Sequence, residues 1–131
     1  MNEINKKRNV DIELLKATEA WKAAQNLFED GLFADCMSRA YYASFHFATA
    51  ALFTIGLEAR SHQGLLKLFD KHFIKTKIFE PELSKVLRRA QKLREESDYR
   101  HTFVFTKEET AEELKQIGHF IKKLAQYLQE K

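Results

Sequence analysis

Apolar side chains recur every three or four positions along most of this chain, which is the spacing of one face of an α-helix. Five such segments can be separated: about residues 11–29, 33–55, 62–73 and 81–99, and a last one that opens after Thr106. The stripe predicted for the first segment consists of Ile12, Leu15, Ala20, Ala23, Leu27 and Phe28. No alternation of apolar and polar residues persists long enough to predict a strand. The pattern therefore predicts an all-α protein, an antiparallel bundle of four to five helices.

Residues typical of helix ends stand at the limits of these segments. Asp11 is the predicted N-cap of the first helix, and Gly31 follows its end. Ser61 is the predicted N-cap of the third helix, and Pro81 lies in the first turn of the fourth. Thr106, with a glutamate three residues later, has the pattern of a capping box. Since only two or three residues separate the first two helices, we expect them to form an antiparallel hairpin.

The composition indicates the number of domains, the cellular compartment and the kind of side chains in the core. A chain of 131 residues, 44% apolar and with eleven Phe, predicts a single domain over residues 1–131 with an aromatic-rich core. The lone cysteine, Cys36, excludes a disulfide framework and favours a reducing compartment. The N-terminal segment is polar, and the longest apolar stretch, 40–57, is interrupted by polar residues and shorter than a span of ~20 residues. We therefore expect a cytoplasmic protein without membrane contact.

Several chemistries lack their motifs in this sequence. It contains no glycine-rich phosphate loop, zinc-protease motif, hydrolase motif or calcium loop, and its five histidines are not spaced as metal ligands. We therefore expect no metal and no cofactor. The net charge of +3 permits an anionic partner without requiring one.

Two stripes of polar residues remain as candidate sites. In the second helix, Arg39, Tyr42 and His46 fall on one side, where they form a catalytic site, a ligand site or a core with satisfied polar groups. At the end of the fourth helix, Arg94, Ser97, Asp98 and His101 share a face if that helix continues to His101. Arginine binds phosphate without losing its charge, and histidine transfers protons near neutral pH. The second stripe therefore suits RNA cleavage by internal transfer, or is a solvated helix end.

Three segments of the chain resemble the HEPN superfamily (higher eukaryote and prokaryote nucleotide-binding domain). They are "SRAYYASFHFATAALFTIGL", "SHQGLLKLFDKHFIKT" and "LREESDY", in that order, and the likeness to the small stand-alone prokaryotic branch covers about residues 10–128. The resemblance implies a bundle of four or five helices that forms a homodimer. It also implies a toxin–antitoxin pair in which a minimal nucleotidyltransferase is the antitoxin.

Many active HEPN proteins are metal-independent ribonucleases with an Arg-x4–6-His motif on a late helix near the dimer interface. By resemblance, Arg94 matches the arginine and His101 the histidine, and the residues between them, Ser97, Asp98 and Tyr99, are expected to orient or bind the ligand. Two positions depart from the motif. Glu95 follows the arginine where Asn, Asp or His is usual, and Tyr99 stands where the best-known ribonuclease members have histidine. A tyrosine, with a pKa near ~10, is a poor base at neutral pH.

The resemblance leaves two functions open. The first is a toxin-type protein that cleaves RNA, or binds RNA or a nucleotide, in a dimer groove through Arg94 and His101. The second is a non-catalytic helical module that binds a nucleotidyltransferase partner, which would make Tyr99 a candidate for nucleotidylation. Under both functions, the helix with Arg39, Tyr42 and His46 resembles a structural signature of this HEPN branch. These three residues are expected to support the site from behind rather than to contact the ligand.

A third hypothesis concerns basic residues on or near the fourth helix. In this hypothesis, the track for RNA consists of Lys85, Arg88, Arg89, Lys92 and Arg100. Charged runs of this kind are more often a solvated helix face.

Overall fold

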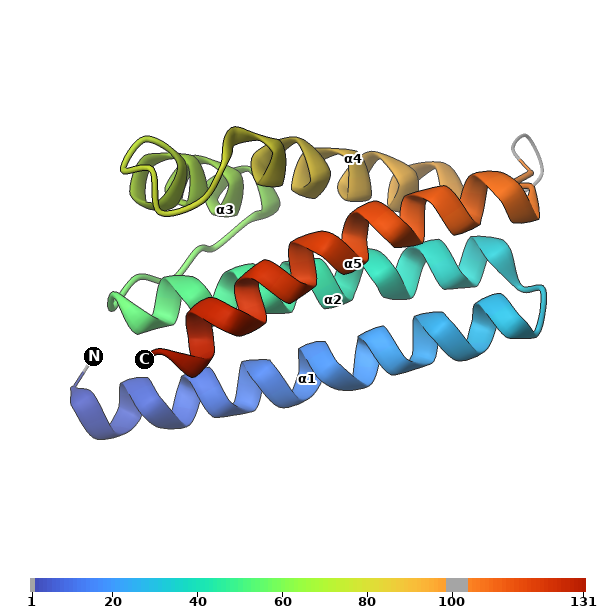
Figure 1. The fold of residues 1–131 in the computed structure, drawn as a ribbon. Helices are drawn as coiled ribbons and strands as arrows, with labels where there is room; N and C mark the ends of the chain where they lie inside the picture. Colours follow the sequence, from blue (N-terminus) through green and yellow to red (C-terminus); the bar gives the residue numbers. More distant parts are fainter. Residues whose placement is uncertain (1, 99–103) are drawn as a thin grey trace.

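The computed structural model describes residues 2–98 and 104–131, and these residues fold into five α-helices without a strand (Figure 1). The helices are α1 (Glu3–Glu29), α2 (Phe33–Thr54), α3 (His62–Phe69), α4 (Pro81–Ser97) and α5 (Lys107–Gln129), and one π-helical turn, Asp70–Ile74, follows α3. The prediction of an all-α fold is confirmed. Figure 1 shows α1 and α2 lying antiparallel, α5 crossing in front of α2, and both chain ends at the same end of the bundle.

Most of the predicted helix ends are confirmed by their hydrogen bonds. The Ser61 hydroxyl accepts the amide of Gly64 at 2.9 Å, and Thr106 and Glu109 form both bonds of a capping box, each 3.1 Å long. Gly31 has a φ of +77°, a left-handed conformation that side chains disfavour, so the turn between α1 and α2 requires glycine there. The α1–α2 hairpin follows from this tight turn.

The predicted start of the first helix is wrong by about eight residues. The helix begins at Glu3, where the side-chain oxygen of Asn2 accepts the amide of Asn5 at 2.8 Å, and Asp11 lies inside the helix rather than at its cap. The segment before Asp11 contains one glutamate, two lysines and one arginine, which favour helix, but it has no apolar periodicity. A search for apolar stripes therefore did not detect this part of α1.

The core is built around α2, which contacts α1, α3, α4 and α5. Small side chains dominate its contact with α1, which allows two helices to approach closely. The buried alanines are Ala17, Ala20 and Ala24 of α1 and Ala40, Ala43, Ala48, Ala50 and Ala51 of α2. At one end of the bundle a cluster of aromatic rings fills the core, as the phenylalanine content predicted, with centroids 5.4–5.9 Å apart among Phe69, Phe73, Phe79, Phe120 and Tyr127.

Two members of the apolar stripe predicted for the first helix are not in the core. Ile12 is 46% exposed and Leu15 is 60% exposed, whereas Ala17 and Ala20 are buried. Two residues turn a helix by about 200°, so Leu15 and Ala17 lie on opposite sides of α1. The side of α1 that packs against α2 is the side with small residues. Ranking side chains by hydrophobicity alone does not identify that side.

Candidate functional site

Arg94 lies in the last turn of α4, where that helix packs against α2. Its Nη2 donates a hydrogen bond to the hydroxyl of Tyr42, 3.1 Å away. The guanidinium carbon lies 5.6 Å from the centroid of the Tyr42 ring and 5.9 Å from that of Tyr41, within the range of cation–π attraction. The side chain is 31% exposed, so the two tyrosines hold the guanidinium in place at the surface.

Among the described residues, the guanidinium of Arg94 donates one hydrogen bond, to Tyr42. Nε is buried and has no hydrogen-bond partner among the described residues, and Nη1 lies 4.0 Å from a carboxylate oxygen of Asp98. Burial disfavours the charged guanidinium, but the hydrogen bond to Tyr42 and the negative charge of Asp98 outweigh it and raise the pKa of Arg94. A permanently charged guanidinium with unused donors is a suitable partner for a phosphate group.

Tyr41, directly behind the arginine, is fixed by a histidine that sequence reasoning did not single out. Its hydroxyl hydrogen-bonds to the imidazole of His62, the first residue of α3. Burial raises the pKa of Tyr41, although the charge of Arg94 opposes this, and burial together with Arg94 lowers the pKa of His62. Both side chains are therefore neutral at pH 7, and one hydrogen bond joins the hydroxyl to the imidazole. Tyr41 and His62 are 21 positions apart, a separation that leaves no spacing signal for the pair.

The two polar stripes of the sequence meet at Tyr42. Arg94 reaches this residue from α4, and Arg39 and His46 flank it on the same side of α2, one turn away in each direction. Nδ1 of His46 lies 2.5 Å from a carboxylate oxygen of Glu13 in α1. Glu13 was not among the predicted residues, because a contact between residues 33 positions apart has no local signature.

Two hollows on the surface between α1 and α2 share Arg39 and Tyr42 in their linings. The first has a volume of about 330 Å³, and its remaining lining residues are Lys16, Glu19, Ala20 and His46. The second has a volume of about 420 Å³, and its remaining lining residues are Leu27, Asp35 and Ser38. We call these two hollows together the α1–α2 groove.

The remaining residues predicted for the site are placed differently. Ser97 is buried, and its hydroxyl donates to the backbone carbonyl of Arg94 at 2.7 Å, while Asp98 is exposed. Tyr99 and His101 lie outside the described residues. The helix α4 ends at Ser97, and whether His101 shares a face with Arg94 stays a prediction.

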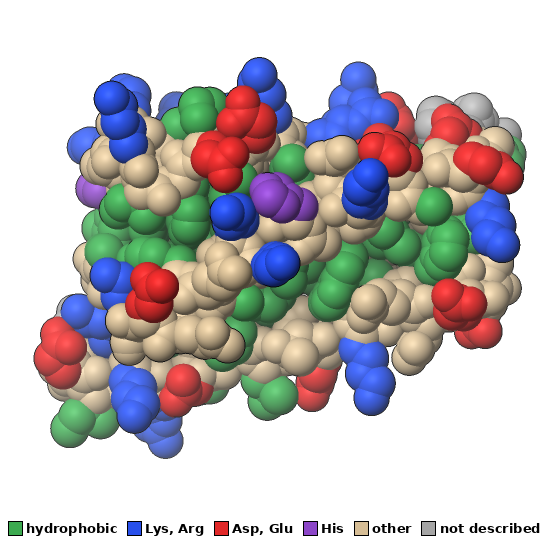
Figure 2. Space-filling model, in the orientation of Figure 1, with side chains coloured by type: hydrophobic (Ala, Val, Ile, Leu, Met, Phe, Trp, Pro, Cys, Tyr) green, Lys and Arg blue, Asp and Glu red, His purple; other side chains and the backbone are tan. Residues whose placement is uncertain are grey.

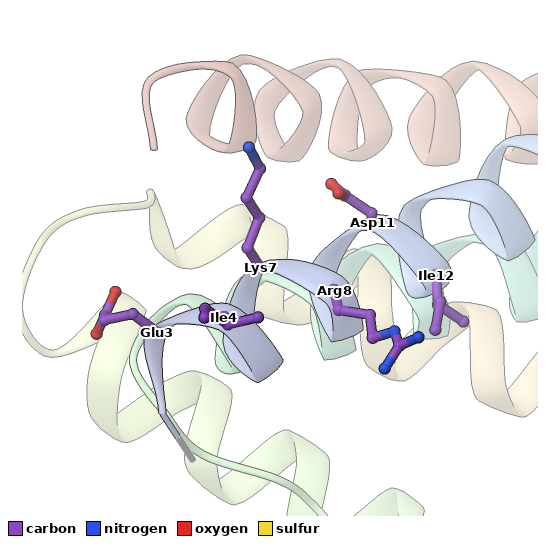
Figure 3. Close-up of a pocket in the computed structure, with 6 residues that line it drawn as sticks. All are labelled: Glu3, Ile4, Lys7, Arg8, Asp11 and Ile12. Atoms are coloured by element: carbon purple, nitrogen blue, oxygen red, sulfur yellow. The ribbon is translucent and has the colours of Figure 1, made fainter.

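A third hollow, of about 520 Å³, lies along the first turns of α1 (Figure 3). Its lining consists of Glu3, Ile4, Lys7, Arg8, Asp11 and Ile12. Figure 3 shows Lys7 and Asp11 extending to one side of the helix and Arg8 and Ile12 to the other, so these side chains do not converge on a common point. It contains no histidine or nucleophile, and we do not assign chemistry to it.

Metal and thiol chemistry find no support in the part of the chain that is described. It contains no cluster of three or more histidine, cysteine, aspartate or glutamate side chains able to hold a metal ion. Burial raises the pKa of the Cys36 thiol to about 12, so this cysteine is no nucleophile at neutral pH. None of the described helices is both long and apolar enough to cross a membrane.

The basic residues of α4 are partly neutralised. Arg88 pairs with Asp70 at 2.6 Å, and Arg89 pairs with Glu113 at 3.0 Å. Figure 2 shows basic and acidic side chains intermixed along α4 on the face in view. Arg100 lies outside the described residues. A continuous basic track therefore does not follow from these side chains.

Comparison with known proteins identifies the family. The model of the HEPN domain matches residues 12–128. A protein of Methanocaldococcus jannaschii named "Putative toxin" is 35% identical over 127 residues, covering 96% of this chain and 86% of that protein. A second protein of that name and organism is 37% identical over 83 residues, 63% of this chain and 62% of its own length. An Archaeoglobus fulgidus protein named "UPF0332 protein" is 38% identical over 90 residues, covering 69% of this chain and 71% of that protein.

This chain therefore belongs to the HEPN family, which confirms the resemblance drawn from its sequence. Within that family, it is a toxin-like HEPN protein, similar over nearly its whole length to the relative named "Putative toxin".

Proposed function

We propose that this HEPN protein is the toxin of a toxin–antitoxin pair and acts as a metal-independent endoribonuclease in which Arg94 binds the RNA phosphate. The observation that supports this most strongly is the setting of Arg94. Two tyrosine rings and one hydroxyl hold the guanidinium, yet Nη1 donates no hydrogen bond to a described side chain. The names of the related proteins favour the toxin class but do not specify a reaction.

The reaction proposed is an internal transfer. The 2′-oxygen attacks the adjacent phosphorus, the bond from phosphorus to the 5′-oxygen breaks, and the products are a 2′,3′-cyclic phosphate and a 5′-hydroxyl. The 2′-hydroxyl loses its proton to a base, and the 5′-oxygen gains one from an acid. In the proposal Arg94 stabilises the charge that develops on the phosphoryl oxygens, and His101 donates the proton to the 5′-oxygen.

Two further parts of the proposal concern partners. We expect a homodimer, because a second copy would bring a second Arg94 and His101 to the site, and we expect a nucleotidyltransferase antitoxin. Sedimentation velocity over a concentration series tests the homodimer, and mass spectrometry of Tyr99 after co-expression tests the antitoxin. If the protein binds a nucleotidyltransferase but cleaves no RNA, the non-catalytic interaction module is the better description.

The test of the activity is RNA cleavage by the purified protein in excess EDTA. Arg94→Ala is expected to lower kcat by about 100-fold or more, the size typical of losing one charge-stabilising donor, and His101→Ala by a similar factor. Arg89→Ala is the matched control, since this arginine is also on α4 but pairs with Glu113. Equal cleavage by the wild type and both site variants, or dependence on added metal, would contradict the proposal.

A further inference from the structure

The proposed reaction requires two proton transfers, and His101 accounts for one. A second histidine is therefore of interest if it is accessible, oriented and close to Arg94. Among the described residues His46 meets these conditions. Its side chain is 22% exposed and lines the smaller hollow of the α1–α2 groove. It lies one helical turn from Tyr42, a rise of about 6 Å, and Tyr42 binds Arg94.

The orientation of His46 is set by Glu13. The Glu13 side chain is 14% exposed, and its two oxygens face two cations or potential cations: Oε2 lies 2.5 Å from Nδ1 of His46, and Oε1 lies 3.8 Å from Nζ of Lys16. A carboxylate can only accept a hydrogen bond, so it holds the proton of a neutral imidazole on Nδ1. Nε2 then carries the lone pair. It has no hydrogen bond to any described residue, and so it can accept a proton from a ligand in the groove.

The lining of the groove carries charges of both signs, with Lys16 and Arg39 basic and Glu19 and Asp35 acidic. Arg39 is exposed and contributes to both hollows, and Arg94 lies at Tyr42 on the side of α4. Arg94 contacts Tyr42 and Arg39 lines the same hollows as Tyr42, and two such guanidinium groups suit a phosphodiester, which has two oxygens for them to bind. The volumes, about 330 and 420 Å³, are within the range of small-ligand sites.

We propose that the α1–α2 groove binds the phosphate backbone of single-stranded RNA and that Glu13 presents His46 as the base of the cleavage reaction. This inference rests on the proposed ribonuclease function. Nε2 of His46 accepts the proton of the 2′-hydroxyl as the 2′-oxygen bonds to phosphorus. The bond from phosphorus to the 5′-oxygen breaks, the 5′-oxygen takes a proton from the acid of the proposed reaction, and His46 returns its proton to water. Glu13 is a positioning residue, because it acts only through the imidazole.

The binding part is tested without catalysis. The probe is a 2′-O-methyl oligoribonucleotide, which lacks the attacking hydroxyl, titrated into ¹⁵N-labelled protein. We expect the resonances of His46 and Arg39 to shift, and Arg39→Ala to weaken binding about tenfold or more, the usual loss for one charge-assisted hydrogen bond. Arg60→Ala, an exposed arginine in the loop before α3, is the matched control. Equal affinity of Arg39→Ala and Arg60→Ala for the probe, with no shift at His46, would overturn the proposal that RNA binds in the α1–α2 groove.

The role of Glu13 has a spectroscopic signature that a purely structural role would not give. At a pH where His46 is neutral, imidazole ¹⁵N shifts are expected to show the proton on Nδ1. In Glu13→Gln the amide NH₂ can donate to Nδ1 instead, which moves the proton to Nε2. We expect this variant and His46→Gln to lower kcat by about 100-fold with KM nearly unchanged. His119→Gln, on the exposed face of α5, is the control.

The two proposals fail in different ways. If the wild type cleaves RNA, and His46→Gln and Glu13→Gln cleave equally well, the inference is wrong and the ribonuclease function stands. If the wild type cleaves no RNA but the 2′-O-methyl probe binds at Arg39 and His46, the ribonuclease function and the base role are wrong, and the groove stands as an RNA-binding site.

Discussion

Tyr42 connects the parts of the candidate site. Its ring and hydroxyl both contact Arg94, and the same residue lines both hollows of the α1–α2 groove. The sequence indicated Tyr42 only as a member of a stripe on α2. Nothing in the local pattern indicated that its partner is an arginine 52 residues away.

Tyr42→Phe removes the hydroxyl and keeps the ring. We expect it to lower the free energy of unfolding by about 1 kcal/mol and to lower kcat for RNA cleavage about tenfold, because Arg94 loses one fixed contact. Tyr127→Phe is a matched control, since its hydroxyl also forms a side-chain hydrogen bond, to Thr54 at 2.8 Å, in a different part of the bundle. A similar loss of activity in both variants would show that the effect is one of stability.

His62 predicts a pH dependence of stability. Burial first, and the charge of Arg94 second, lower the pKa of His62 in the folded protein, so the unfolded chain binds the proton more readily. This contribution to stability is complete above the unfolded pKa of about 6.5 and is lost as the pH falls through the lower, folded value. Urea unfolding at pH 7.5 and 5.5 should show a larger loss of stability for the wild type than for His62→Gln. An identical loss in both proteins would rule out this role.

At the scale of the helices, most helix ends could be predicted from the local sequence, because the residues that form a cap are only three positions apart. Ser61 and Thr106 form the predicted hydrogen bonds. The side on which a helix packs is a property of two helices together, and here the sequence pattern misled. Ile12 and Leu15 have the hydrophobicity of core residues, but the buried side of α1 carries alanines that fit closely against α2.

Substitutions in α1 test this assignment of faces. Leu15→Ser should change the free energy of unfolding by no more than about 0.5 kcal/mol, as expected for an exposed site. Ala24→Leu should destabilise by about 1–3 kcal/mol, because the new side chain has no room at a fully buried position. Urea denaturation of both variants measures the difference. A larger loss for Leu15→Ser than for Ala24→Leu would mean that α1 packs on its other side.

At the scale of the whole molecule, the contacts that define the site join elements distant in the sequence. Arg94–Tyr42 joins α4 to α2, Tyr41–His62 joins α2 to α3, and Glu13–His46 joins α1 to α2. The family and the all-α fold could be recognised from residue order and periodicity. These pairs could not, because they depend on how the helices pack, and Glu13 and His62 were missed for that reason.

Charge over the whole molecule predicts how RNA binding responds to salt. The net charge is +3, and Arg88 and Arg89 are already paired with acidic side chains. If Arg39, Arg94 and one further cation contact phosphates, the slope of log affinity against log salt should be about −2, from roughly −0.7 per contact on a single strand. Fluorescence anisotropy at four salt concentrations measures the slope. A value of about −4 or steeper would indicate a larger basic track.

The most direct test of phosphate binding by Arg94 is a crystal structure of the protein with a 2′-O-methyl oligoribonucleotide. We expect a phosphate oxygen at about 2.7–2.9 Å from the guanidinium of Arg94, with the Tyr42 hydroxyl still bound to the same arginine. An oligonucleotide bound elsewhere, with no phosphate at Arg94, would contradict the central claim that this arginine is the phosphate-binding group of the site.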